Sequence, residues 1–143
     1  MKTGLFILIT FHGLFHLAGF SRAFDLEAMI QLTQSISKPN GILWLFSAVI
    51  FVLTALLFVL KKDSWWMISA FGIVLSQYLV FTNWHDAKFG TIANIIILLA
   101  VISGYGRWAF RKKYKTEVIT YLGQAISSPD SLDGFDFTSF LHA

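Results

Sequence analysis

Two histidines, His12 and His16, lie four residues apart in an apolar stretch near the start of the chain. Residues at this spacing share one face of a helix, so both imidazoles would point the same way. Polar side chains are costly in hydrocarbon and face the interior of a helix bundle, where they find partners. The topology described below brings polar residues of two later segments to the same half of the bilayer. The predicted polar cluster comprises His12, His16, Gln77, Asn83, His85, Asp86, Lys88, Thr91 and Asn94.

This cluster is compatible with several kinds of chemistry. Imidazole and carboxylate groups bind zinc or non-haem iron, so the metal candidates are His12, His16, His85 and Asp86. A haem held by two histidines is an alternative, and a His–Asp pair beside a mid-membrane histidine could instead relay protons. A serine hydrolase is disfavoured, because the chain has no G-x-S-x-G motif. Neither a cofactor nor a catalytic residue can be named from these residue types.

Each residue of the cluster also has a structural interpretation. The two imidazoles could be neutral and satisfied by neighbouring helices. Asp86 is placed to cap the helix that follows, where a carboxylate accepts bonds from unpaired backbone N–H groups. Gln77 and Asn94 would then join helices by hydrogen bonds, and Lys88 would sit among the headgroups. The tryptophans are expected to be interfacial anchors rather than ligand platforms.

The elements that would position this cluster follow from composition. The chain is 56% hydrophobic and 13% charged over 143 residues. A soluble domain of this size could not cover so much apolar surface, whereas a bilayer accepts it. Four apolar runs approach the ~20 residues that cross a bilayer. They predict an all-α, polytopic membrane protein with a four-helix bundle over residues 1–110 and spans at about 4–20, 42–60, 64–83 and 91–110.

The basic residues predict the orientation of these spans. Four spans place both termini and the second loop on one side, which carries eight of the 11 Lys and Arg residues. Basic residues favour the cytoplasm. Both termini are therefore expected in the cytoplasm of a bacterium, the protein in its inner membrane, and the polar cluster in the outer half. The first run is expected to be retained rather than cleaved as a signal peptide, because Arg22 follows it where a cleavage site would be.

The connecting and terminal segments predict short amphipathic helices at the membrane surface. Residues 21–41 are too many for a tight hairpin and carry apolar residues at helical spacing, which is typical of an interfacial helix. Residues 111–126 predict a basic amphipathic cytoplasmic helix. Residues 127–143 are rich in Asp and turn-forming residues and are expected to be a poorly ordered acidic tail.

Small residues predict where the helices approach one another. Gly72 and Ser76 form one small-x-x-x-small pair, and Ala100 and Gly104 form another. This spacing permits close contact between membrane helices. It favours a packed bundle over four separate anchors.

Three stretches resemble a family of bacterial four-helix membrane domains without an assigned function. They are residues 12–20 (HGLFHLAGF), residues 32–39 (LTQSISKP) and residues 86–94 (DAKFGTIAN). The resemblance covers roughly residues 1–121 and implies a fold and a membrane location only. In that family a soluble domain often follows, and it is expected to be absent or truncated here after Ser127. The architecture is also similar to that of DoxX-like four-helix proteins.

These observations leave three classes of function open. A binding, assembly or accessory subunit with an outward-facing polar pocket is favoured. A small membrane enzyme or redox subunit with a His/Asp metal or haem site is the alternative, and a channel or transporter is the third. The absence of cysteine excludes disulfides and thiolate sites. The expected partners are membrane lipids and other membrane protein subunits, and no nucleic acid, because basic residues in such a chain set topology.

Overall fold

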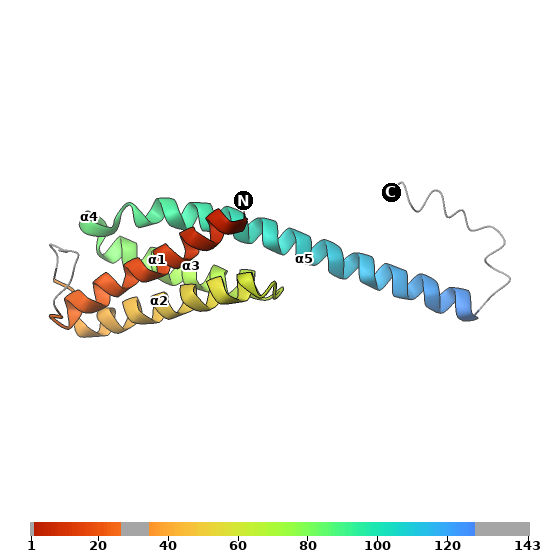
Figure 1. The fold of residues 1–143 in the computed structure, drawn as a ribbon, viewed down its shortest axis with the longest axis horizontal. Helices are drawn as coiled ribbons and strands as arrows, with labels where there is room; N and C mark the ends of the chain where they lie inside the picture. The colour runs from red at the N-terminus through yellow and green to blue at the C-terminus, as the bar shows by residue number, and fades with distance from the viewer. Residues whose placement is uncertain (1, 27–34, 128–143) are drawn as a thin grey trace. The chain divides into compact units, whose positions relative to one another are not determined.

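The structure, a computed structural model, describes residues 2–26 and 35–127, and side chains as far as Gln124. All regular secondary structure in these ranges is helical. Figure 1 shows the helices in chain order. The chain divides into two compact units at the Tyr105–Gly106 boundary, and each is described by itself. The helices are α1 (Lys2–Ala23), α2 (Lys38–Val59), α3 (Trp65–Thr82), α4 (Trp84–Ala87) and α5 (Gly90–Ser127).

Four of these helices, α1, α2, α3 and α5, are long and apolar enough to cross a membrane. The predicted all-α, multi-pass membrane fold with a four-helix bundle is therefore confirmed. The fourth span continues into residues 111–126 without a break, because α5 is a single helix. Residues 27–34 of the segment predicted to hold an interfacial helix, and nearly all of the predicted acidic tail, lie outside the described residues. The ends of that segment belong to α1, which runs to Ala23, and to α2, which begins at Lys38.

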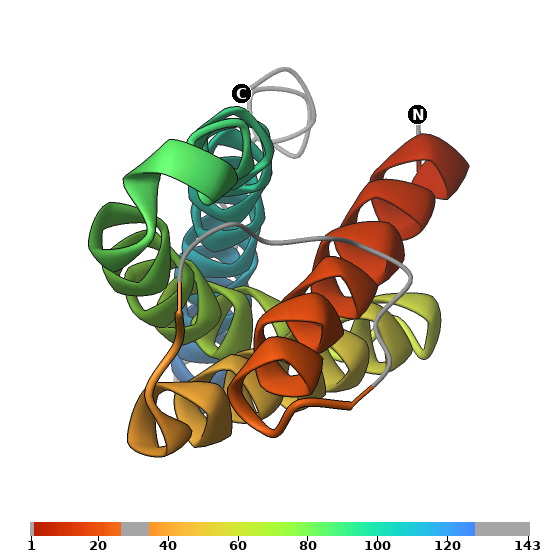
Figure 2. The same cartoon turned by 90° about the vertical axis from the view of Figure 1, so that its left-hand side faces the viewer.

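Figure 2 shows the helices of the bundle end on. Their close approach depends on glycines that face bulky side chains. A Cβ on Gly13 of α1 would lie 2.9 Å from the Cβ of Phe51 on α2, and a Cβ on Gly19 would overlap the Trp44 ring. A Cβ on Gly72 of α3 would lie 2.7 Å from Ile50. Because such contacts leave no room for a side chain, glycine allows α1, α2 and α3 to pack backbone against side chain.

The surface of the bundle is apolar while its interior carries hydroxyl groups. Val74 and Leu99 are more than 60% exposed, as expected of side chains that face lipid. The core joins Ile9, Phe51 and Ile97 from three different helices. Four hydroxyl residues are fully buried between the helices: Ser47, Thr54, Ser69 and Ser76.

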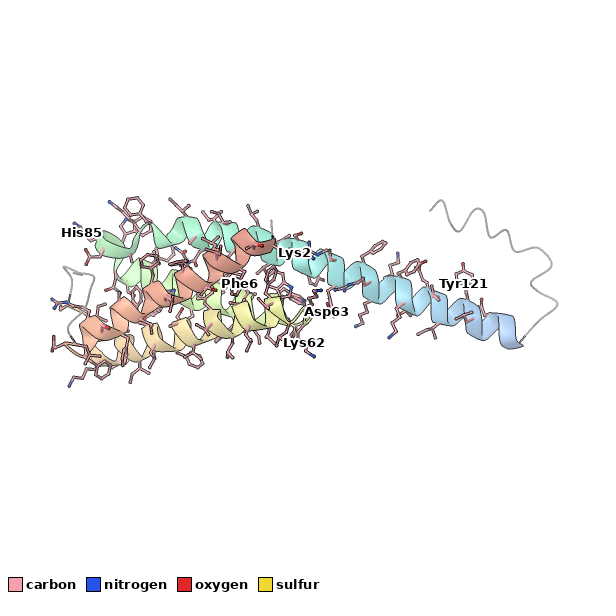
Figure 3. All side chains as sticks on the ribbon, in the orientation of Figure 1. Lys2, Phe6, Lys62, Asp63, His85 and Tyr121 are labelled. Atoms are coloured by element: carbon pink, nitrogen blue, oxygen red, sulfur yellow. The ribbon has the colours of Figure 1, made fainter. Side chains whose placement is uncertain are left out.

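The two ends of the bundle differ in the residues they carry. Lys2, Lys62 and Asp63 lie at one end, and His85 lies at the opposite end (Figure 3). The N-terminus and the α2–α3 turn therefore share an end, as four antiparallel spans require. The α4 end is the end at which the polar cluster was expected.

The second unit consists, in its described residues, of the remainder of α5. Its surface combines basic and aromatic side chains. Lys113 pairs with Glu117 at 3.8 Å, and the rings of Phe110 and Tyr114 are stacked. Residues 111–126 are helical throughout, as part of α5.

The break between α3 and α5 shapes the α4 end. Asn83 ends α3 with φ −125° and ψ 40°, outside helical values. Its Nδ2 donates to the Leu79 carbonyl at 3.1 Å and to Thr82 Oγ1 at 3.0 Å. An asparagine side chain that bonds to its own helix end competes with helix continuation. The chain therefore turns at Asn83, and α4 forms a short separate helix.

Candidate functional site

The hydroxyl of Ser76 on α3 is the centre of a buried polar network. His12 Nε2 lies 3.2 Å from Ser76 Oγ, and His16 Nε2 lies 3.0 Å from it. Asn94 of α5 meets the same oxygen through both its Oδ1, at 3.1 Å, and its Nδ2, at 3.0 Å. One hydroxyl therefore joins α1, α3 and α5.

The Ser76 hydroxyl has more neighbours than hydrogen bonds. It carries one donor hydrogen and two acceptor positions, so three of its four contacts can be hydrogen bonds at one time. The tautomer of each imidazole decides whether its Nε2 donates to Ser76 or accepts from it. The network can therefore exchange donors and acceptors without moving a heavy atom.

Gln77 and Thr91 extend this network between α3 and α5. Asn94 Nδ2 donates to Gln77 Oε1 at 3.0 Å, and Gln77 Nε2 donates to Thr91 Oγ1 at 3.1 Å. Five of the nine predicted cluster residues, His12, His16, Gln77, Thr91 and Asn94, are thus joined through Ser76 in one hydrogen-bonded set.

A cavity of about 340 Å³ lies beside the two histidines, at the α4 end of the bundle. His12, Phe15, His16 and Ala18 supply its α1 wall. The other walls come from α2, α3, α4 and the start of α5. Its volume falls in the range of small-molecule sites, and such sites are mostly apolar with few polar groups. The remaining lining residues are Trp44, Val80, Asp86, Ala87, Phe89, Gly90 and Ala93.

Two side chains of this cavity wall carry buried polar atoms without a hydrogen-bond partner among the described residues. They are Nδ1 of His16 and Nε1 of Trp44. His16 is 2% exposed and Trp44 is 5% exposed, and their ring centroids lie 5.0 Å apart. Buried polar groups are nearly always paired, because leaving one unpaired costs about 1–3 kcal/mol. This pair is therefore a feature that needs a physical explanation.

Asp86 and His85 lie at the α4 end but in different surroundings. His85 Nδ1 lies 3.1 Å from Asp86 Oδ1. The His85 side chain is 77% exposed, whereas that of Asp86 is 10% exposed and lines the cavity. The Lys88 ammonium is exposed and lies 5.6 Å from the centre of the Phe89 ring. Asp86 thus shares a cavity with His12 and His16, while His85 and Lys88 do not line it.

The structure does not bring the four metal candidates, His12, His16, His85 and Asp86, into one cluster. Nowhere in residues 2–26 and 35–127 do three His, Asp or Glu side chains come together in a way that could hold a metal ion. The reason is the turn at Asn83, because a continuous α3 would have kept His85 on the same face as Gln77. His12 and His16 lie on one helix and both Nε2 atoms contact Ser76, so these two residues would not hold a haem between them.

Two further expectations about single residues change. Asp86 lies within α4 and not at the residue preceding α5, so it is not positioned as the N-cap of α5. Asn83 bonds to the end of α3 instead of facing the cavity. Its side-chain amide therefore stabilises the end of α3.

Two residues of the site were not expected from the sequence. Ser76 was noted only as a small packing residue, although its hydroxyl lies on the α3 face that meets His12 and Asn94. Trp44 was expected to be an anchor, but it is buried against Gly19 and His16. The signal for Trp44 was the glycine at position 19, which leaves room for a large ring.

Comparison of this chain with models of known families, with curated proteins and with solved structures finds no match.

Proposed function

We propose that this protein is a membrane-embedded binding protein that holds a small, largely apolar molecule in the cavity beside His12 and His16. The observation that carries the proposal is the cavity itself, about 340 Å³ in volume and lined mostly by apolar side chains together with His12, His16 and Asp86. A mostly apolar lining with a few polar groups is typical of small-molecule sites.

The position of the cavity supports this function. The residues that line the cavity are far apart in the sequence. His12 and Trp44 come before α3, whereas Gly90 and Ala93 lie at the start of α5. The Ser76 network holds α1, α3 and α5 together beside it. The cavity is therefore fixed by buried hydrogen bonds, and a rigid surrounding of this kind lowers the entropic cost of binding.

Filling the cavity should abolish binding. Ala93 lines the cavity, so Ala93→Phe would occupy it with a ring. We expect the purified wild-type protein to retain a small molecule that mass spectrometry of the organic extract detects, and Ala93→Phe to lose it. Ala18→Phe, from the α1 wall, should have the same effect through a different helix.

The matched control is Ile95→Phe, on the same helix but 53% exposed towards lipid. It should retain the molecule as the wild type does. An identical extract from the wild-type protein, Ala93→Phe and Ala18→Phe would refute the proposal, as would a wild-type protein that retains nothing.

We further propose that the protein lies in a bacterial inner membrane with both termini in the cytoplasm. The charge distribution supports this orientation, since Lys61 and Lys62 lie in the same loop and Lys2 shares their end of the bundle. Reporter fusions after Lys62 and after Lys115 should report the cytoplasm, and a fusion near Gln34 should report the outside. A cytoplasmic signal near Gln34 would reverse the orientation and place the cavity in the inner half.

Membership in the bacterial four-helix membrane family that the HGLFHLAGF and DAKFGTIAN stretches resemble is part of this proposal. Both stretches supply walls of the cavity, through His12, His16 and Asp86 in particular. A binding function located there would therefore be shared by proteins that carry the same two stretches.

A further inference from the structure

We infer that the part of α5 that follows Tyr105 binds the headgroups of anionic phospholipids through one face of the helix. This basic face consists of Arg107, Trp108, Arg111, Lys112 and Lys115. It belongs to the second compact unit and shares no residue with the cavity, so the inference is independent of the proposed function. It is carried by the length of α5, by the point at which its charged residues begin and by their arrangement around the helix.

Helix α5 is too long to lie wholly within a bilayer. It has 38 residues, and at about 1.5 Å per residue it is about 57 Å long. The hydrocarbon core is about 30 Å thick, and even a tilt of about 40° would enclose only about 40 Å of helix. A substantial part of α5 therefore lies outside the hydrocarbon.

The charged residues of α5 begin at the point where it leaves the hydrocarbon. Residues 90–106 carry no charged side chain. The next nine positions hold five basic residues, which are Arg107, Arg111, Lys112, Lys113 and Lys115. Because a charge within hydrocarbon is costly, α5 leaves the hydrocarbon close to Arg107. From Arg107 to Lys115 the helix rises about 12 Å, which is little more than the electrostatic screening length of about 8–10 Å. These side chains are therefore within electrostatic reach of the headgroups.

Four of the five basic residues gather on one side of the helix. At about 3.6 residues per turn, the members of the basic face fall within an arc of about 140°, and no other residue of 107–115 lies in that arc. Its four charged side chains are exposed. Lys113 lies outside the arc and pairs with Glu117 at 3.8 Å. Since Glu117 is the one acidic residue in 106–124, the charge of the basic face is positive throughout.

The orientation of the chain in the membrane does not require this arrangement. Basic residues near the end of a span fix orientation by their number, whichever side of the helix they occupy. Arg107 with Arg111, and Arg111 with Lys115, are like-charged pairs at i,i+4, and such pairs destabilise a helix. Negative charge beside the basic face offsets this repulsion. Lipid phosphates supply negative charge at the level where α5 leaves the hydrocarbon.

Trp108 favours a lipid headgroup over a soluble acidic partner. It lies within the basic face, and Lys112 Nζ is 5.3 Å from the centre of its ring. Tryptophan is enriched at the membrane–water interface, where its ring lies at the level of the headgroups. A cluster of basic residues directly after a membrane span is typical of segments that bind anionic lipids. The basic face combines both features.

Competition between two lipids with identical acyl chains tests the inference. The full-length protein is solubilised in dodecyl maltoside, freed of lipid and mixed with equimolar phosphatidylglycerol and phosphatidylcholine. Native mass spectrometry then counts the molecules of each lipid that remain bound. We expect phosphatidylglycerol to be preferred by about fivefold or more, which is the effect of one basic side chain near an anionic surface.

Arg111→Gln/Lys115→Gln is the test variant, because glutamine preserves helix propensity and removes two charges from the basic face. Both side chains are exposed, so the variant is expected to fold as the wild type does. Its preference for phosphatidylglycerol should fall below about twofold. Lys62→Gln/Lys113→Gln is the matched control, since it removes the same net charge from exposed positions outside the basic face. It should keep the preference of the wild type.

Three results would overturn the inference. The first is equal binding of the two lipids to the wild-type protein. The second is an equal preference in the two double variants, because net charge and not the basic face would then decide binding. The third is displacement of phosphatidylglycerol by polyglutamate at the same concentration of negative charge, which would identify a docking surface for an acidic protein segment. None of these results bears on the cavity, which Ala93→Phe and Ala18→Phe test separately.

Discussion

Replacing Ser76 with alanine should lower the free energy of unfolding by about 2–4 kcal/mol. The change removes the oxygen that His12, His16 and Asn94 share, and it leaves their polar atoms buried between helices. Each stranded group costs about 1–3 kcal/mol in a protein interior, although hydrogen bonds between membrane helices are often weaker. Reversible unfolding in mixed detergent micelles, with a denaturing detergent added stepwise, measures the change.

Ser69→Ala is the matched control for this prediction. Ser69 lies two turns earlier on α3, is as fully buried as Ser76, and its hydroxyl has no hydrogen-bond partner among the described residues. Removing an unpaired hydroxyl should leave the stability unchanged or raise it slightly. Equal destabilisation by Ser69→Ala and Ser76→Ala would mean that the network adds nothing beyond packing volume.

Leucine at Gly72 or Gly104 should destabilise the bundle by about 3 kcal/mol or prevent its assembly. A Cβ at Gly72 would already meet Ile50 at 2.7 Å, and a Cβ at Gly104 would meet the Trp65 ring at 2.6 Å. A whole leucine side chain therefore requires the helices to move apart. The melting temperature and the yield of the detergent-solubilised protein report the effect.

Gly4→Leu provides the comparison, because a Cβ at Gly4 meets no described atom within 4 Å. It should be tolerated, since an apolar side chain at an exposed position of α1 faces lipid or headgroups. Tolerance of Gly72→Leu and Gly104→Leu to the same degree would show that the two glycines do not set the distance between helices.

Much of the fold could be predicted because hydropathy reports directly on span length. The second span was expected at 42–60 and α2 is Lys38–Val59, while the third was expected at 64–83 and α3 is Trp65–Thr82. The far end of the fourth span could not be predicted. Helix α5 continues past 110 because residues 111–126 contain no proline, whereas hydropathy marks only where apolar residues end.

The candidate site was predictable where helical spacing alone decides position. His12 and His16 share a face, and Asn94 meets them because its helix neighbours α3. Helical spacing could not predict the position of His85. The non-helical backbone of Asn83 changes the direction of the chain, so the residues after it no longer lie on the faces of α3. Ser76 was missed because a serine in an apolar helix has the same small size as the residues that favour packing, and only its neighbours reveal its hydroxyl.

The chain is made from its N-terminus, and this order has a consequence for the Ser76 network. His12 and His16 precede Ser76 by 64 and 60 residues, so they are synthesised about 3–13 s before their hydrogen-bond partner. During that interval the Ser76 hydroxyl is not yet present to bond the two imidazoles, and hydrocarbon disfavours unpaired polar groups. Helix α1 is therefore the first span to be made but among the last to be secured in its final place, when α3 and α5 arrive beside it.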